Sequence, residues 1–179
     1  MGTSFIERLG EEGWTYIKTV VDIMREPVLI LNEDLRVIAA NDPFYKIFQV
    51  ESKDTENKIV YELGNGQWDI PALRKLLEDI LPKNTFFKGF EVAHEFPLIG
   101  RKVMILNARE IHCTDKPGME PCPPIIMLAI EDVTDMIGVA ETFASYTKQM
   151  ENKLTEQTEE LGVNIKKLQK EVNELKNKG

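Results

Sequence analysis

Side chains suited to metal binding or nucleophilic chemistry are few in this sequence. His112 and Cys113, followed nine residues later by Cys122, carry nitrogen and sulfur atoms of the kind that bind zinc. Zinc sites, however, usually have four ligands and closely spaced cysteine pairs. We therefore expect no metal site, and we interpret the two cysteines as thiols in a loop rich in proline and glycine.

The stretch HEFP at residues 94–97 is similar to the phosphoacceptor box of histidine kinases. That box lies on a helix, whereas the apolar residues around His94 alternate, which predicts a strand. The chain also has no glycine motif for nucleotide binding and no recognisable catalytic triad or carboxylate pair. We therefore expect that the chain is not an enzyme, and that any kinase or methyltransferase activity would lie outside it.

Composition bounds the class of protein. The chain has 179 residues, of which 42% are hydrophobic and 29% charged, as expected for one globular domain with an appendage. The net charge of −8 disfavours nucleic-acid binding. No apolar run approaches the roughly 18–20 residues of a membrane span, and the N-terminus does not resemble a signal peptide. We expect a cytoplasmic protein.

The elements of the first half can be predicted from periodicity and turn residues. An apolar stripe predicts a helix near residues 4–25, which Pro27 ends. Two short β-branched runs, 28–32 and 36–41, flank a polar turn and predict a β-hairpin. Asn41 then stands where it can cap a helix whose first turn contains Pro43.

The second half begins with one helix and continues with three strands. Pro71 in the first turn and a leucine stripe predict a helix in DIPALRKLLEDILP, which Asp69 would cap. Alternating apolar residues predict strands in 86–96, 101–112 and 124–133. The order of elements predicts an α+β fold, in which a five-stranded antiparallel sheet carries helices on one face.

Together these stretches resemble the PAS domain family over about residues 14–135. The residues that carry the resemblance are PVLILNEDLRVIAANDPFYKIF, ELGNGQWDIPALRKLLEDILP, FEVAHEFPLIGRKVMILNAREI and MLAIEDVTD. They are most similar to the PAS modules of histidine kinases and of chemotaxis methyltransferases and methylesterases. Asn41 matches the asparagine that opens the helix after the second strand, and Asp132, Val133 and Thr134 match the D-[IV]-T motif. The resemblance implies sensing or protein coupling in a two-component system.

Many PAS domains enclose a ligand cavity. The helix before the third predicted strand has no histidine, so a haem site of the usual kind is not expected. The helix after Asn41 has no cysteine for a flavin adduct, whereas a non-covalent flavin or no cofactor at all both stay open. The resemblance implies the following candidate pocket residues: Phe44, Ile47, Phe48, Trp68, Leu76 and Ile80.

The C-terminal part of the chain carries a heptad repeat. Leu154, Leu161, Leu168 and Leu175 occupy position d, and Ile165 and Val172 occupy position a, as in parallel two-stranded coiled coils. Acidic residues in 151–160 and lysines in 166–178 also suit antiparallel pairing, and a single helix folded back on the domain is a further alternative. Extended backwards, the same register reaches Val133, Ile137, Ala140, Ala144, Thr147 and Glu151.

We thus expect an N-terminal flanking helix in residues 1–26, a PAS domain in 27–134 and a signalling coiled coil in 135–179. The N-terminal and C-terminal helices would form a homodimer. The domain would bind a small ligand or a partner, and the Asp132-Val133-Thr134 junction would transmit the change to an output domain or protein. The alternatives are a ligand-free scaffold and the sensor fragment of a histidine kinase or methyltransferase.

Overall fold

The computed structural model describes residues 5–112 and 124–177. The chain divides into two compact units, Met1–Thr134 and Asp135–Gly179. The first unit contains the whole sheet and the N-terminal helix, so that helix belongs to the globular unit. The second unit is one helix.

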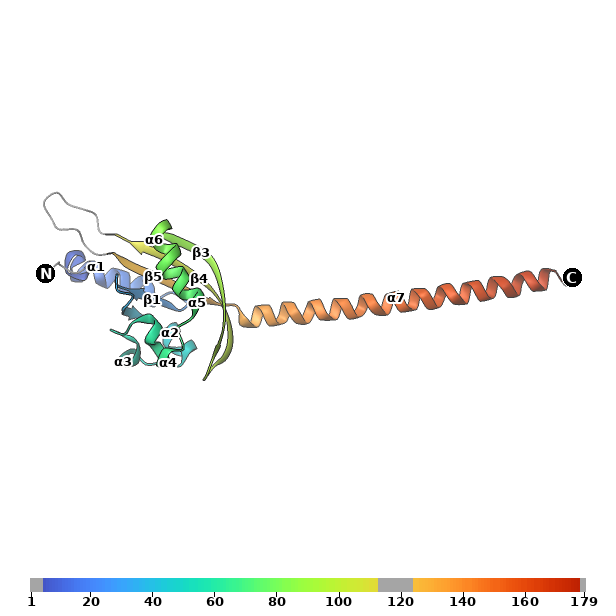
Figure 1. The fold of residues 1–179 in the computed structure, drawn as a ribbon, viewed down its shortest axis with the longest axis horizontal. Helices are drawn as coiled ribbons and strands as arrows, with labels where there is room; N and C mark the ends of the chain where they lie inside the picture. Colours follow the sequence, from blue (N-terminus) through green and yellow to red (C-terminus); the bar gives the residue numbers. More distant parts are fainter. Residues whose placement is uncertain (1–4, 113–123, 178–179) are drawn as a thin grey trace. The chain divides into compact units, whose positions relative to one another are not determined.

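The first unit is built on a five-stranded antiparallel sheet with the strand order β2-β1-β5-β4-β3 (Figure 1). The two strands of the predicted hairpin lie at one side, and β5 inserts between them and the long β4–β3 pair. This order brings the last strand into the centre of the sheet. The strands are β1 (Val28–Leu31), β2 (Val37–Ala40), β3 (Phe86–Phe96), β4 (Gly100–Ile111) and β5 (Ile125–Asp132).

Short helices between β2 and β3 cover one face of this sheet. Leu106 and Ile130, which are paired across β4 and β5, both point into the resulting core. Alternate residues of each strand face this side, because side chains alternate along a strand. The elements are α2 (Asp42–Phe48), α3 (Ser52–Thr55), η1 (Val60–Glu62), α4 (Leu63–Gly66), α5 (Pro71–Arg74), η2 (Lys75–Ile80) and α6 (Leu81–Asn84).

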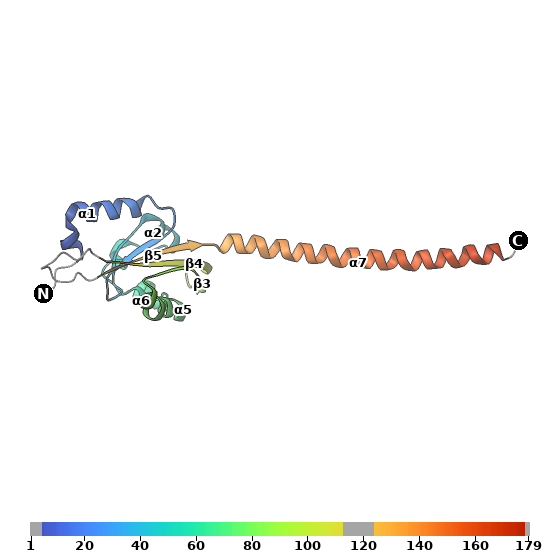
Figure 2. The ribbon, with the colours of Figure 1, turned by 90° about the horizontal axis from the view of Figure 1, so that it is seen from above.

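Helix α1 (Phe5–Asp22) covers the opposite face, over the β1 end of the sheet (Figure 2). Val21 is buried there against Val28 and Ile30 of β1, and Trp14 and Ile17 pack on the same small cluster. The expectation of helices on one face is therefore right for the insert between β2 and β3. The N-terminal helix adds a second layer.

The leucine-rich helical region differs from its sequence prediction at both ends. Its first helix begins after Ile70, which makes no side-chain cap, so the prediction that Asp69 caps it is wrong. Asp69 instead pairs with Arg74. The helix then continues as a π-helix, η2, and Pro82 does not end it because this proline stands in the first turn of α6.

The two outer strands of the sheet are protected differently. At β2, the Val37 N–H donates to Lys58 O over 2.9 Å, and Val37 O accepts from Asn57 N over 2.8 Å. A segment of coil thus occupies the outer side of β2. At β3, the register shifts between Phe87 and Phe90, and the Gly89 N–H, at φ +74°, donates to Asn107 Oδ1. This is a bulge of the kind that interrupts strand edges.

Helix α7 (Thr134–Lys176) has 43 residues and buries no side chain. Most of its large apolar residues are at least about half exposed, with Ile137 near its start partly buried, whereas the first unit buries most of its large apolar residues. Among the described residues, no helix has both the length and the apolar character needed to cross a membrane.

Candidate functional site

The Asp132-Val133-Thr134 junction lies where β5 ends and α7 begins. The Lys102 ammonium on the neighbouring strand β4 donates to Asp132 Oδ2 over 2.7 Å. Both side chains are only about one-fifth exposed, at 22% and 20%. The lysine–aspartate pair therefore links the end of β5 laterally to β4 in a partly desolvated place.

Residue Thr134 completes the attachment. Its hydroxyl accepts from the Val103 N–H over 2.9 Å and donates to Asp132 Oδ1. Asp132 Oδ1 also accepts from the Thr134 N–H over 3.1 Å. The aspartate therefore accepts the first N–H of the helix, and the threonine hydroxyl binds β4.

Residue Val133 anchors the same point through burial. Its side chain is 4% exposed, and its N–H donates to Val103 O over 2.9 Å. Val133 thus belongs to the sheet, and the prediction that the heptad seam begins near it is wrong.

Electrostatics favour the ionised form of Asp132. Burial alone would raise the pKa of this carboxyl, but the hydrogen bonds from Lys102 and Thr134 outweigh burial and hold the pKa below its ordinary value. The carboxylate is therefore charged at neutral pH, and its bonds to both neighbours are charge-assisted.

Residue Asn41 stands at a second junction, between the N-terminal helix and the core. It is the N-cap of α2, where its Oδ1 accepts from Phe44 N over 3.2 Å and from Val28 N over 2.9 Å. Its Nδ2 donates to Val21 O and Glu26 O. This buried amide therefore connects α1, β1 and α2, which is more than a helix cap requires.

The six predicted pocket residues lie together inside the first unit. Phe44, Phe48, Trp68 and Phe96 form one aromatic cluster, with ring centroids 4.7–5.6 Å apart. Sequence reasoning missed Phe96, although its place in the alternating strand pattern was visible. Leu76 is fully buried beside them, and Ile47 and Ile80 pack at the border. The four rings of the cluster pack against one another.

One polar atom in this cluster is unsatisfied. Trp68 is 1% exposed, and its Nε1 has no hydrogen-bond partner in the part of the chain that the structure describes. Nearby, Tyr61 lies under the Arg74 guanidinium, 3.9 Å from ring centroid to Cζ. Burial, and then Glu78, raise the pKa of the Tyr61 hydroxyl, so this phenol is neutral.

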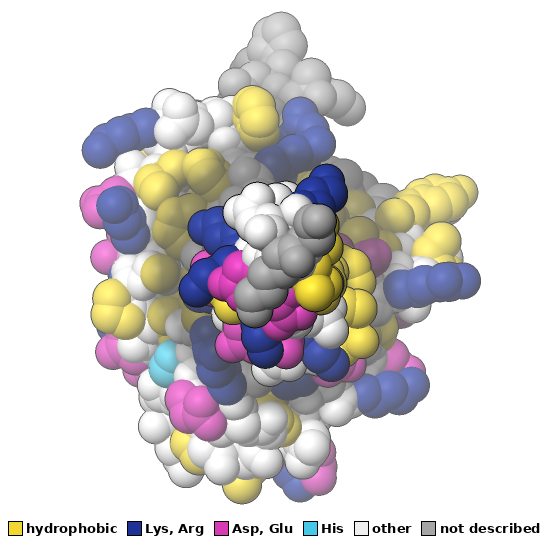
Figure 3. Space-filling view, turned by 90° about the vertical axis from the view of Figure 1, so that its right-hand side faces the viewer, with side chains coloured by type: hydrophobic (Ala, Val, Ile, Leu, Met, Phe, Trp, Pro, Cys, Tyr) yellow, Lys and Arg dark blue, Asp and Glu magenta, His cyan; other side chains and the backbone are white. Residues whose placement is uncertain are grey.

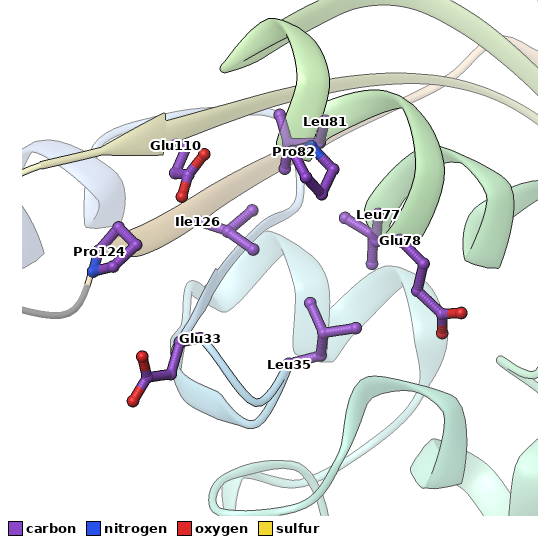
Figure 4. A pocket seen from close by; sticks show the side chains of 9 residues that line it. All are labelled: Glu33, Leu35, Leu77, Glu78, Leu81, Pro82, Glu110, Pro124 and Ile126. Atoms are coloured by element: carbon purple, nitrogen blue, oxygen red, sulfur yellow. The ribbon is translucent and has the colours of Figure 1, made fainter.

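A cavity of about 320 Å³ lies beside the core, where the β1–β2 turn meets η2, α6 and the ends of β4 and β5 (Figure 4). Leu35, Leu77 and Ile126 point into it, and Glu33 and Glu78 stand at its rim with their carboxylates directed away. None of its lining residues was predicted as a site, because they come from five separate segments.

The other sequence candidates carry no further site. His94 lies on β3, partly buried, with its ring 4.8 Å from Phe96, as the predicted strand required. Cys113 and Cys122 lie outside the described residues. Within the described residues, no group of three metal-binding side chains comes together. The six predicted seam residues, Leu154, Leu161, Ile165, Leu168, Val172 and Leu175, are all exposed on α7.

Comparisons with known proteins agree with this fold. Residues 15–83 match the family model described as PAS domain. A LOV protein from Rhodobacter sphaeroides has 12% identity and a TM-score of 0.54, over 70% of this chain and 69% of its own. The PAS domain of a Colwellia psychrerythraea protein has 9% identity and a TM-score of 0.50, over 68% of this chain and 98% of its own.

A PAS domain from a two-component sensor histidine kinase has 6% identity and a TM-score of 0.49, and it covers 68% of this chain and 97% of its own. No curated protein matches the chain. The first unit thus has the PAS fold, a five-stranded antiparallel sheet with helices, and residues 15–83 of it match the PAS family model. Helix α7 follows this unit directly along the chain.

Proposed function

We propose that this chain is a signal-transduction module, in which the PAS domain passes a change in its sheet to α7 and through α7 to a dimeric output. The observation that carries this proposal is the attachment of the first residue of α7 to β4 through Asp132, Val133 and Thr134. A displacement between β4 and β5 would alter these bonds, and the helix begins without an intervening loop.

The dimer in this proposal is held by the seam on α7, with α1 as a second contact. Leucine at d with isoleucine and valine at a is the pattern of parallel two-stranded coiled coils. An isolated helix with so little burial is marginal in water, so a partner helix is the economical way to stabilise it. The proposed module contains no catalytic residues and acts on an output domain or protein.

The test uses the reciprocity of coupling: if a change in the sheet affects the α7 dimer, then a change in the α7 dimer must affect the sheet. Joining the two α7 helices by a disulfide at Leu175→Cys, in a Cys113→Ser/Cys122→Ser background, should change amide exchange at Val103 and Val133. Asp132→Ala should abolish that change, and Glu131→Gln, at the exposed preceding residue, should preserve it. Identical exchange in β4 with free and joined helices would refute the transmission.

A second candidate is a coupling module without a ligand. The mutual contacts of the rings of Phe44, Phe48, Trp68 and Phe96 favour it, because a filled core leaves little room for a cofactor. Native mass spectrometry of freshly purified full-length chain separates the two cases. A stoichiometric small molecule supports ligand sensing, and an unliganded dimer supports coupling by a protein partner.

A further inference from the structure

The first half of α7 presents its own apolar series. Five large apolar side chains of this half are each at least 50% exposed: Met136, Val139, Phe143, Tyr146 and Met150. They follow one another at intervals of three and four residues, which is the a/d spacing of a coiled coil. We call these five residues the proximal seam.

The remaining exposed series is the leucine repeat. We call it the distal seam, and its members are Leu154, Leu161, Ile165, Leu168, Val172 and Leu175. It also keeps the three–four spacing, with Thr158 as the polar member at position a.

The two seams do not share a register. Continued forward, the proximal register would place Lys153, Gln157 and Glu160 in the core of a dimer. Continued backward, the distal register would place Glu151 and Thr147 there, and it ends at Val133, which is buried in the sheet. Each register is apolar in its own half of the helix, and the two differ by one residue between Met150 and Thr158.

Both seams nevertheless lie on one side of the helix. At about 100° per residue, all their members fall within a stripe roughly 120° wide. Figure 3, which looks along α7, shows hydrophobic side chains gathered on one side of the helix and charged side chains around the rest. One straight partner helix could therefore cover the whole stripe.

The flanking residues identify the partner's direction. Beside the proximal seam stand the small or uncharged residues Ala140, Thr142, Thr147 and Gln149, so nothing there repels an identical helix. Beside the distal seam, Glu171 at g and Lys176 at the following e attract each other in a parallel pair.

The acidic and basic clusters do not oppose this direction. Glu156, Glu159 and Glu160 fall at the outer positions b, c and f, and so do Lys166, Lys167 and Lys170. Charges there face away from the seam in either direction, so they give antiparallel pairing no close contact.

We propose that the proximal seam is an interface with the proximal seam of a second copy of this chain, parallel and in a register one residue out of step with the distal seam. This rests on the dimer of the proposed function. The mismatch is absorbed between Met150 and Thr158, where the helices run straight, since a straight α-helix drifts about 20° per heptad against a 3.5-residue repeat.

With this interface, the proximal register and the distal register compete for the middle of α7. If the proximal seam disengages, the distal register can extend backward only by burying Thr147 and Glu151. The junction at Asp132 lies next to the proximal seam along the chain, so a change in the sheet would act first on this half. Signalling would then be a choice between an engaged and a disengaged proximal seam.

Disulfide cross-linking of the full chain tests the register, in a Cys113→Ser/Cys122→Ser background with copper phenanthroline as oxidant. The matched variants are Val139→Cys against Ala140→Cys, and Tyr146→Cys against Thr147→Cys. Position d brings identical residues together in a parallel dimer, so Val139→Cys and Tyr146→Cys should cross-link at least ten times faster than their neighbours. Leu161→Cys reports the distal dimer, and Lys148→Cys, at f, is the control for random collision.

The outcomes separate the two proposals. Faster linking at Ala140 and Thr147 than at their neighbours, together with linking at Leu161, keeps the dimer and overturns the proximal register. Equal rates at neighbouring positions also overturn it, because no fixed seam would exist. No linking at Leu161, with a monomer in sedimentation, overturns both, and a dimer without linking at Leu161 overturns the parallel direction.

Discussion

The two units of this chain treat the same kinds of side chain in opposite ways. Phe44 in the first unit is fully buried, and Phe143 on α7 is 72% exposed. The first unit buries most of its large apolar side chains, with exceptions such as Tyr16 and Ile23 near the N-terminus, while α7 keeps a line of apolar side chains in solvent. The difference is consistent with a first unit that holds its own core, and it leaves the apolar line of α7 for the partner helix that we propose.

Polar groups follow the same division. The buried amide of Asn41 makes four hydrogen bonds to four different residues of the first unit. On α7, the hydroxyls of Thr147 and Thr158 donate hydrogen bonds to backbone carbonyls one turn earlier in the same helix. Tertiary structure therefore orders the polar side chains of one unit, and local helix geometry orders those of the other.

The largest expected effect distinguishes the two phenylalanines. Phe44→Ala removes a ring from the aromatic cluster, so it should lower the free energy of unfolding by about 3–5 kcal/mol. Phe143→Ala is the matched control and should change unfolding of the first unit by less than about 0.5 kcal/mol. Urea titration followed by tryptophan fluorescence measures both, and equal losses would contradict the division.

Two leucines provide the reverse comparison. Leu168→Ala should raise the dissociation constant of the dimer by at least about 100-fold, because two side chains per dimer lose their contacts, each worth roughly 1.5–3 kcal/mol. Leu76→Ala, in the core, should instead lower the stability of the first unit by about 2–5 kcal/mol. Sedimentation equilibrium reads the first effect and urea titration the second. A dimer unaffected by Leu168→Ala would argue against the distal seam.

The junction between the units should respond to acid. The depressed pKa of Asp132 means that its ionised form stabilises the fold, and this contribution is present above the ordinary aspartate pKa of about 3.9. It is lost as the pH falls through the lower folded-state pKa. Asp132→Asn should therefore cost about 1–2 kcal/mol at neutral pH, and this cost should shrink as the pH falls through the folded-state pKa. A pH-independent cost would exclude the ion pair with Lys102 as its source.

The smallest expected effect concerns a glycine in α7. Gly162 lies inside the helix, and a Cβ there would meet no atom within 4 Å. Gly162→Ala should stabilise the helix by up to about 1 kcal/mol, visible as tighter dimerisation in sedimentation equilibrium. Gly138→Ala, equally open, is the companion variant near the proximal seam. A weaker dimer for Gly162→Ala would mean that the partner helix needs the space.

Much of the fold could be predicted from sequence, because local signals agree with tertiary structure. Alternating residues marked the strands, and Asn41 and Pro43 marked the start of α2. Asp69 is not the cap because the helix begins one residue later, after Ile70, and its carboxylate pairs with Arg74, five residues on, a contact that the capping rule does not consider. The prediction that the heptad register begins near Val133 is wrong because this residue is buried against β4, before the start of α7.

The candidate sites divide along the same line. The motif residues of the junction could be named from sequence, but their partners Lys102 and Val103 could not, since these depend on how β4 pairs with β5. The cavity beside η2 was missed for the same reason. The spacing of the proximal seam could be seen in the sequence. It was missed because the heptad repeat of the leucines, extended towards the N-terminus, falls one residue away from it.

The guarded edges of the sheet have a consequence for assembly. The coil around Lys58 already occupies the hydrogen-bonding side of β2, and the bulge around Gly89 breaks the ladder on β3. The longest regular edge left to a foreign strand is therefore Phe90–Phe96, past the bulge, where β3 pairs with β4 in unbroken register. A strand added to this sheet would have to pair there, which confines edge-to-edge polymerisation to one short stretch.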